Sequence, residues 1–548
     1  MKRTRLLSHT QKIWLGWFAI IAAAILAGLL LAALDGSQAI WSGVLAYMLL
    51  LLLGVCGLLG MRRLLHANHA AWRAAIVASM VRLVIGVILM LILPQAGYQD
   101  NPASQAGYLF KDAYRRDVQA WELAQSSAPI ITAFAGEFSG DQYGGMLALS
   151  ALIYRYLSAD AHRPFLVLIV TAAVSALGVL ATWGVVKAWF GEPAALISAW
   201  LMALYPEAVL LGASHMREAL VIPAIAFAWY GMVAVTERSA RGGWLVAIAA
   251  IVLLLVQPAA ALGVFLVLLV LWTLDPSRRL SLKRAFIAGG LSLLALVVLY
   301  SIWAHLPSLQ YTKGWQVFVQ WLENNFMFQG KITVRASGWL QNIIGDLGEQ
   351  WRGVVLLVYG IFQPVLPAAL ITPGASIWRV VGIFRAAGWY FILPFLVYIP
   401  WMAWVEKSER HRRQLIWLAM VMWGWTLIAS ANGGGDQWDN PRYRTMFLVF
   451  MAGAIGWMWQ TLRLRDNWRE KHRWFHRLVA LEGVFILVFS YWYVGRKYIR
   501  AIWLDIWVVL IIFLVLGGGI ILWGWRQDHK RRQAAATEET PSEDRKAV

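Results

Sequence analysis

The 548-residue sequence contains a single cysteine and few charged residues. Because Cys56 stands alone, no intrachain disulfide and no cysteine metal cluster can form. Charged residues make up only 14% of the chain, and they stand in short clusters between apolar runs. This distribution excludes an ordinary soluble enzyme.

Several diagnostic motifs are also absent. The sequence has no Walker A phosphate loop, no HExxH and no GxSxG, so ATP-driven transport, zinc proteolysis and α/β-hydrolase chemistry lack support. The formal net charge is +19, but no basic stripe with interleaved aromatic residues stands on a soluble module. Nucleic acid is therefore not an expected partner.

Apolar residues make up 60% of the chain, with a mean hydropathy of +0.60. Continuous apolar runs long enough to cross about 30 Å of hydrocarbon favour helices over a barrel. The sequence predicts an all-α polytopic membrane protein with about 14 transmembrane or half-membrane helices. They are expected near 12–34, 40–60, 74–94, 164–190, 193–213, 217–236, 244–256, 258–274, 285–304, 386–405, 414–431, 445–461, 478–494 and 501–524.

The basic clusters indicate the orientation. With the N-terminus in the cytoplasm, nearly all of them fall in cytoplasmic loops, as expected for a multi-pass plasma (inner) membrane protein with both termini inside. We expect six regions: N-terminal helices (1–94), a first extracytoplasmic loop (95–161), a transmembrane core (162–304), a second extracytoplasmic loop (305–385), C-terminal helices (386–532) and a disordered cytoplasmic tail (533–548).

Three segments are not expected to span the membrane. The apolar stretch 354–372 contains prolines and is predicted to be re-entrant or interfacial. In 315–326, WQVFVQWLENNF, apolar residues recur at helical spacing, which suits an interfacial helix; a belt of tryptophans is the alternative. The two short helices on either side of Gln257-Pro258 are expected to meet within the outer leaflet.

The segment FKDAYRRDVQAWELA (110–124) concentrates charge in the first extracytoplasmic loop. Asp112 either caps a helix or acts as a general base whose pKa is raised by half-burial. Asp117 lies about 140° away on a helix and is either an ordinary solvated or ion-paired residue or has a different role. Arg115 and Arg116 could bind a phosphate.

The order of features resembles the GT-C superfamily of integral-membrane glycosyltransferases, specifically the family 39-like enzymes that use polyprenyl-phosphate sugars. The resemblance covers roughly 107–275. It rests on the acidic loop, on the polar turn with Asp141 and Tyr143 before an amphipathic run, on WFGEPAALISAWLMALYP (189–206), and on the outward pair Arg217-Glu218. The late outward turn ASANGGGDQWDNPRYRTMF (429–447) resembles the RY element of these proteins, which lies near the lipid phosphate.

The resemblance implies a role for each matching residue. Asp112 would be the base that activates the acceptor, and Asp117 the accessory acid of the same loop. Because the family often has adjacent acids in this loop, whereas Ala113 follows Asp112, the base could instead be Asp117. Glu218 would be the second outward acid. The expected substrate-binding residues are Arg115, Arg116, Asp141, Tyr143, Arg217, Arg442, Tyr443 and Arg444.

The predicted function is transfer of a sugar from a polyprenyl-phosphate donor to an extracytoplasmic glycan, lipid or protein acceptor. No ligand spacing requires a metal, although Mg²⁺ or Mn²⁺ could bind through Asp112, Glu218 or Asp436 with the donor phosphate. The alternatives are a lipid or glycan transporter, or flippase, and a non-catalytic scaffold for envelope assembly. A transporter would place ionisable residues within the spans, where Arg82 is the clearest example.

Overall fold

The computed structural model describes residues 9–135, 138, 141–237, 239–273, 338–371, 374–434, 436–464, 473–499 and 504–538. Helices and no strands occur in these ranges. The N-terminal half contains α1 (His9–Leu34), α2 (Ile40–Leu64), α3 (His69–Ala96), α4 (Pro102–Gln105), α5 (Lys111–Gln125), the 3₁₀ turn η1 (Ile130–Phe134), α6 (Gly145–Leu157), α7 (Pro164–Phe190), α8 (Glu192–Leu204), α9 (Pro206–Gly212), α10 (Glu218–Thr236), α11 (Ala240–Val256) and α12 (Pro258–Thr273).

The C-terminal half is also helical. It contains α16 (Gly338–Leu347), the 3₁₀ turn η3 (Glu349–Trp351), α17 (Arg352–Phe362), α18 (Leu366–Ala369), α19 (Ser376–Val405), α20 (Glu409–Gly433), α21 (Asp439–Thr445), α22 (Leu448–Leu464), α24 (Arg473–Val494), the π-helical turn η4 (Gly495–Ile499) and α25 (Ile506–Glu538).

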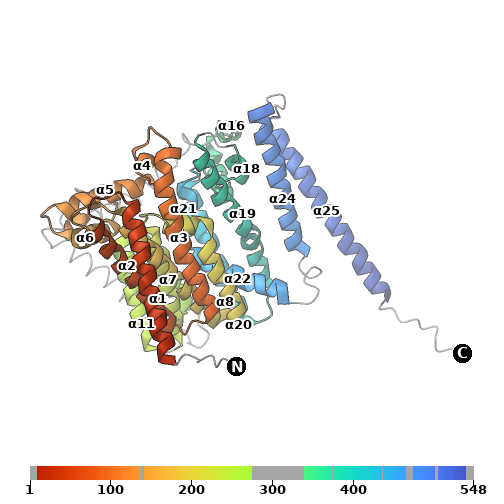
Figure 1. Cartoon of the computed structure of the whole chain (residues 1–548). Coiled ribbons are helices and arrows are strands. Elements are labelled where there is room, and N and C mark those ends of the chain that lie inside the picture. Colours follow the sequence, from red (N-terminus) through yellow and green to blue (C-terminus); the bar gives the residue numbers. More distant parts are fainter. Residues whose placement is uncertain are drawn as a thin grey trace, which may run out of the picture.

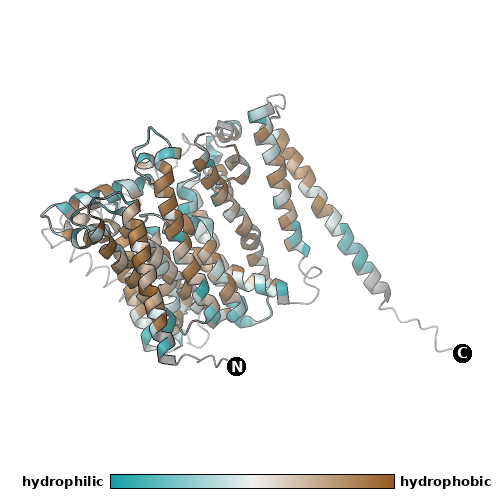
Figure 2. Ribbon diagram, in the orientation of Figure 1, coloured by the Kyte–Doolittle hydropathy of each residue, from teal (hydrophilic) through white to brown (hydrophobic). Residues whose placement is uncertain are grey.

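Nine described helices are long and apolar enough to cross a membrane, and two bent helix pairs raise the number of candidate spans to 11. Figure 2 shows the apolar residues along these long helices. This confirms a polytopic helical protein. The expected total of 14 also included 244–256 and 258–274, which form shorter apolar helices, and 285–304, which lies outside the described residues together with the predicted helix 315–326.

α7 is the most deeply buried of the candidate spans. It packs against α2, α3, α8 and α10, and 78% of its most apolar window is buried, against 22–28% for α1, α2 and α3. A helix that is apolar on all sides must be covered by other helices or by lipid. α7 is therefore the centre of the bundle, whereas α1 to α3 leave much of their surface for lipid.

A break between α8 and α9 shapes one end of the bundle. The two helices meet at 57°, where Pro206 follows Tyr205 and cannot continue the hydrogen-bond pattern. The last carbonyls of α8 bond instead to Arg82 of α3, which donates to Met202 O at 2.8 Å and to Ala203 O at 3.0 Å. The intramembrane Arg82 is thus a partner of the broken helix.

Short helices gather at one end of the molecule. Figure 1 shows α4, α5, α16 and α18 at the end opposite to the start of α1 and the end of α25; we call it the site end. α17 has 11 residues, about half the length needed to cross a bilayer, which agrees with the expectation that 354–372 does not span. α25 continues to Glu538, into the tail that was expected to be disordered.

Candidate active site

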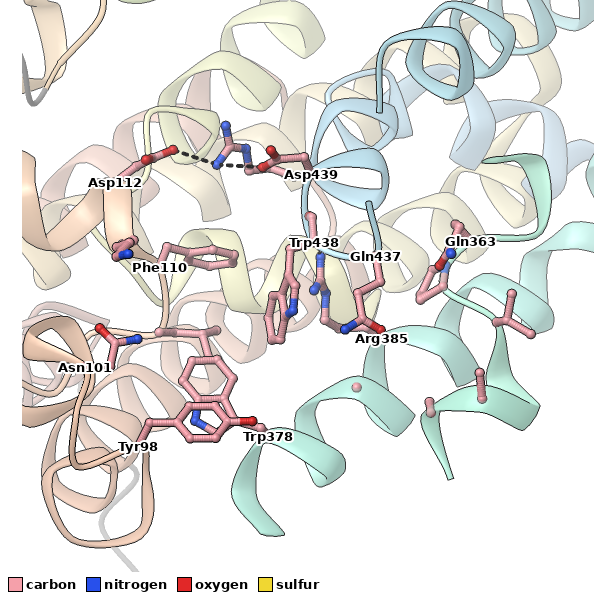
Figure 3. Close-up of a pocket in the computed structure, with 18 of the residues that line it drawn as sticks. Tyr98, Asn101, Phe110, Asp112, Gln363, Trp378, Arg385, Gln437, Trp438 and Asp439 are labelled. Atoms are coloured by element: carbon pink, nitrogen blue, oxygen red, sulfur yellow. Dashed lines mark hydrogen bonds and ion pairs between the residues drawn. The ribbon is translucent and has the colours of Figure 1, made fainter. Parts of the chain in front are cut away.

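A cavity of about 390 Å³ opens at the site end between α5, α19 and α21 (Figure 3). Segments from the α3–α4 turn and from α17 and α18 complete its walls. Its polar lining includes Asp112, Arg385, Asp439 and Arg442. We call it the polar cavity. It brings together groups that lie hundreds of residues apart in the sequence.

Asp112 reaches this cavity from the first turn of α5. The helix begins at Lys111, and Phe110 occupies the N-cap position without a side-chain cap. The interpretation of Asp112 as the helix cap is therefore wrong. Its side chain is 49% exposed and points toward the polar cavity in Figure 3, so an incoming ligand can reach its carboxylate.

Arg442 of α21 lies among three carboxylates. It donates a hydrogen bond of 3.0 Å to Asp112 Oδ2, and its Nε lies 3.2 Å from Glu218 Oε1. Asp439 Oδ1 is 3.5 Å from Nη1. Glu218 begins α10, is fully buried and does not line the cavity. The guanidinium thus connects a buried acid behind it to the open Asp112 in front.

The neighbouring arginines decide the pKa of Asp112. Partial burial alone would raise the pKa of this carboxyl, but the Arg442 guanidinium, together with Arg116 and Arg217, lowers it below its ordinary value. The expectation of a raised pKa is therefore wrong, because half-burial at this site is accompanied by cations. Asp112 is a carboxylate at neutral pH.

Asp117, on the same helix, faces the protein interior. It is fully buried and accepts hydrogen bonds from Tyr108 Oη at 2.5 Å and from Tyr154 Oη. His162 Nε2 lies at 2.7 Å and His215 Nδ1 at 2.9 Å. The carboxylate therefore joins α5, α6, the start of α7 and the α9–α10 connection. The interpretation as a solvated helix residue is wrong, while the ion-paired interpretation agrees with the two histidine contacts.

The environment of Asp117 indicates how this residue affects the stability of the fold. Burial alone would raise the pKa of Asp117, but His215 and His162 hold it far below its ordinary value. The group therefore stabilises the fold at neutral pH, and this contribution is lost as the pH falls below the ordinary aspartate range. The substitution Asp117→Asn keeps the shape of the side chain. It replaces one carboxylate oxygen by an NH₂ group, which faces the four hydrogen-bond donors that surround this position.

We expect Asp117→Asn to cost about 2–5 kcal/mol of stability. The apparent melting temperature of the detergent-solubilised protein would fall by several degrees at pH 7, and the difference from wild type would shrink on acidification. Asp100→Asn, at an exposed position before α4, is the control. A melting temperature equal to wild type at pH 7 would contradict the assigned role.

Arg116 and Arg217 lie near Asp112 but outside the lining of the polar cavity. Arg116 is buried, with Nη1 2.7 Å from His215 O and Nε 3.5 Å from Asp141 Oδ1. The other oxygen of Asp141 accepts the backbone N–H groups at the start of α6. Arg217 lies over the Tyr143 ring at 5.0 Å. These residues flank the Asp112 region without lining the polar cavity.

The other basic residues predicted to bind substrate lie in different environments. Arg115 is exposed and does not line the cavity. Arg444 is buried, donates to the carbonyl of Gln363 at 2.6 Å and lies over the Trp389 ring. Tyr443 lies beside Arg442, whose guanidinium carbon is 5.0 Å from the ring centroid. Of the two late arginines, only Arg442 faces the polar cavity.

Sequence reasoning missed a buried ion pair in the cavity wall. Arg385 of α19 contacts both carboxylate oxygens of Glu207, at 2.5 and 2.8 Å, and donates to the carbonyl of Trp438 at 2.9 Å. The available signal was Glu207, an acidic residue inside the predicted span 193–213, since such residues are usually functional or paired. Asp439 was also missed, although it lies three residues before Arg442.

The acids of the site surround a guanidinium. Among the described residues, no group of three or more histidine, cysteine or acidic side chains could hold a metal ion. Asp436, a candidate ligand, uses Oδ1 to accept the backbone N–H groups of Trp438 and Asp439. The residues present do not fit a divalent metal.

A second cavity adjoins the first. It measures about 490 Å³ and lies between α16, α17, α19, α24 and α25. Its lining is aliphatic and aromatic apart from Glu482. Tyr359 and Val365 line both cavities. This apolar cavity therefore runs along membrane-spanning helices and ends at the polar cavity.

No family model and no curated protein matches this chain.

Proposed function

We propose that this protein is a GT-C-type membrane glycosyltransferase that transfers a sugar from a polyprenyl-phosphate donor to an extracytoplasmic acceptor. One observation carries the proposal: a polar cavity with an open carboxylate and a buried arginine shares two wall residues with an apolar cavity between spanning helices. A substrate with a charged head and a long hydrocarbon tail suits this combination.

The tail would occupy the apolar cavity. The lining helices α19, α24 and α25 are candidate membrane spans, so a lipid could enter from the bilayer without crossing water. Tyr359 and Val365 then mark the point where the chain ends and the phosphate begins. Arg385, Arg442 and Lys111 line the polar cavity beyond this point. The two guanidinium groups would hold the phosphate, since they can bind its oxygens in pairs.

Asp112 would act on the acceptor. Its carboxylate takes the proton of an acceptor hydroxyl or amine while the acceptor atom bonds to the anomeric carbon of the sugar. The bond from that carbon to the phosphate oxygen breaks, and polyprenyl phosphate leaves with the electron pair. Direct displacement inverts the anomeric configuration, and the cations stabilise the departing phosphate.

Donor binding would prepare the base. Without donor, Arg442 donates a hydrogen bond to Asp112 and keeps its pKa low, which weakens it as a base. A phosphate that engages Arg442 competes for this guanidinium, so the pKa of Asp112 rises toward its ordinary value. Glu218, buried behind Arg442, would hold the guanidinium in place throughout.

The transporter alternative has less support. Its clearest sequence feature, Arg82, is buried and bonded to the carbonyls that end α8, as expected of a structural residue. The open acid and the cavity cations instead gather at the site end. A scaffold protein would keep its role without Asp112, which the Asp112→Asn variant tests directly.

A substitution in the apolar cavity tests the proposed donor. Val397 of α19 lines this cavity and is 41% exposed, whereas Val380 of the same helix is 60% exposed and lines neither cavity. We expect Val397→Trp to raise the KM for a polyprenyl-phosphate sugar by about tenfold or more, because the indole fills space that the tail needs. Val380→Trp should leave it unchanged. Equal KM values in the two variants would contradict the assignment.

A further inference from the structure

One wall of the polar cavity carries a group of aromatic rings. Tyr98 and Trp378 stack with centroids 5.7 Å apart, and Trp438 meets Trp378 edge-on at 5.2 Å. Phe110 meets Trp438 edge-on at 6.5 Å. All four rings line the polar cavity and none lines the apolar cavity. Figure 3 shows them below Asp112 and Asp439.

Side-chain amides line the same cavity: Figure 3 shows Asn101 and Gln437 near the rings and Gln363 on the other side of the cavity. Asn101 uses only its oxygen, which accepts the N–H of Ala103. Within the described part of the chain, the side-chain amides of Gln363 and Gln437 form no hydrogen bond. Together with the open carboxylates of Asp112 and Asp439, the wall offers donors and acceptors next to flat apolar surfaces.

We propose that the acceptor is a saccharide and that its ring binds on this aromatic wall, with Tyr98 as a specificity-determining residue. The inference rests on the proposed function, because it names the acceptor class for the same site. Aromatic faces carry partial negative charge and attract polarised C–H groups of a sugar ring. Sugar hydroxyls both donate and accept, which matches amides and carboxylates in one cavity.

A lipid acceptor fits this wall less well. An acyl chain on the rings would cover Asn101, Gln437 and the carboxylates without offering them a hydrogen bond, which costs free energy for each unpaired group. The apolar cavity already provides a place for hydrocarbon. A saccharide instead satisfies the polar groups and covers the rings.

The position of the wall suits an acceptor. Tyr98 and Asn101 come from the turn between α3 and α4, and Tyr98 is 36% exposed. Phe110 precedes the proposed base by two residues. A sugar on this wall would place a hydroxyl near Asp112, while the donor approaches from the apolar cavity past Tyr359 and Val365, which line both cavities.

Saturation-transfer difference NMR on the full chain in lipid nanodiscs tests the inference without any transfer reaction. The probes are maltose, xylobiose and N,N′-diacetylchitobiose. We expect at least one disaccharide to receive saturation at its ring C–H protons. Its affinity should fall about fivefold or more in Tyr98→Ala, which removes one aromatic contact, and stay near wild type in Tyr98→Phe. Tyr156→Ala, at a position 71% exposed and outside the cavity, is the control.

Two results would overturn the saccharide site: no binding of any of the three disaccharides, or equal binding by wild type and Tyr98→Ala. A different result would refute the proposed function. Tyr98-dependent binding without sugar transfer from any polyprenyl-phosphate donor would refute the transferase and keep the site. Transfer that proceeds only to a lipid or peptide acceptor would keep the transferase and refute the saccharide site.

Discussion

Asp112→Asn is expected to lower kcat/KM for sugar transfer by about 10²–10⁴-fold, the usual contribution of a general base. The amide is nearly isosteric, and its oxygen can still accept the hydrogen bond from Arg442, so substrate positioning is kept. It cannot take the acceptor proton. Because the side chain is half exposed and does not cap α5, the fold should be unaffected.

The controls for this variant separate chemistry from folding. Asp100→Asn changes an exposed acid outside the polar cavity and should transfer at the wild-type rate. The apparent melting temperature of Asp112→Asn should fall by much less than that of Asp117→Asn, because the Asp112 side chain is half exposed and its ion pair with Arg442 is weakened by solvent. Normal transfer by Asp112→Asn would remove it from the mechanism and favour a scaffold.

Removing the Arg442 guanidinium has the second large effect. Arg442→Gln alone removes the nearer cation from the buried Glu218 and leaves only Arg217, whose Nε is 3.8 Å from Oε1, so it costs up to about 3–5 kcal/mol of stability. The double variant Arg442→Gln/Glu218→Gln avoids that cost. It should still lose about 10²–10³-fold in kcat, because one donor to the developing phosphate charge is gone.

The same double variant makes a pH prediction. In the free enzyme, Arg442 holds the pKa of Asp112 below its ordinary value, so the wild-type kcat/KM is lost only when the pH falls through that low pKa. Without Arg442, the pKa of Asp112 rises. The acidic limb of the kcat/KM-against-pH profile therefore moves to higher pH. Arg352→Gln is a control, because its partner Glu349 lies outside both cavities. An unshifted limb in the double variant would contradict the coupling of Asp112 to Arg442.

Helical geometry explains much of what the sequence could predict. Residues five apart lie about 140° apart on a helix, and α5 places Asp112 toward the cavity and Asp117 toward the interior. The same rule shows that the two arginines of α21 point in different directions. Arg442 and Arg444 differ by about 200°, so only Arg442 can face the cavity. The sequence pattern alone did not distinguish these two arginines.

Other features depend on distant packing, which periodicity does not reveal. Asp112 and Arg442 meet across 330 positions in the sequence, and Arg385 meets Glu207 across 178. The pKa of Asp112 depends on the first of these encounters, so burial alone predicted its direction wrongly. Three of the four partners of Asp117, Tyr154, His162 and His215, likewise come from other segments, which the local charge pattern could not show.

The most direct test is transfer by the purified protein in nanodiscs. Polyprenyl-phosphate hexoses and pentoses labelled in the sugar serve as donors, with the acceptor supplied as an extract of envelope glycans, lipids and proteins. Our proposal predicts a labelled product with inverted anomeric configuration, one polyprenyl phosphate released per sugar, and no reaction with nucleotide sugars. Retention of configuration, use of a nucleotide sugar, or no transfer from any polyprenyl-phosphate donor would contradict it.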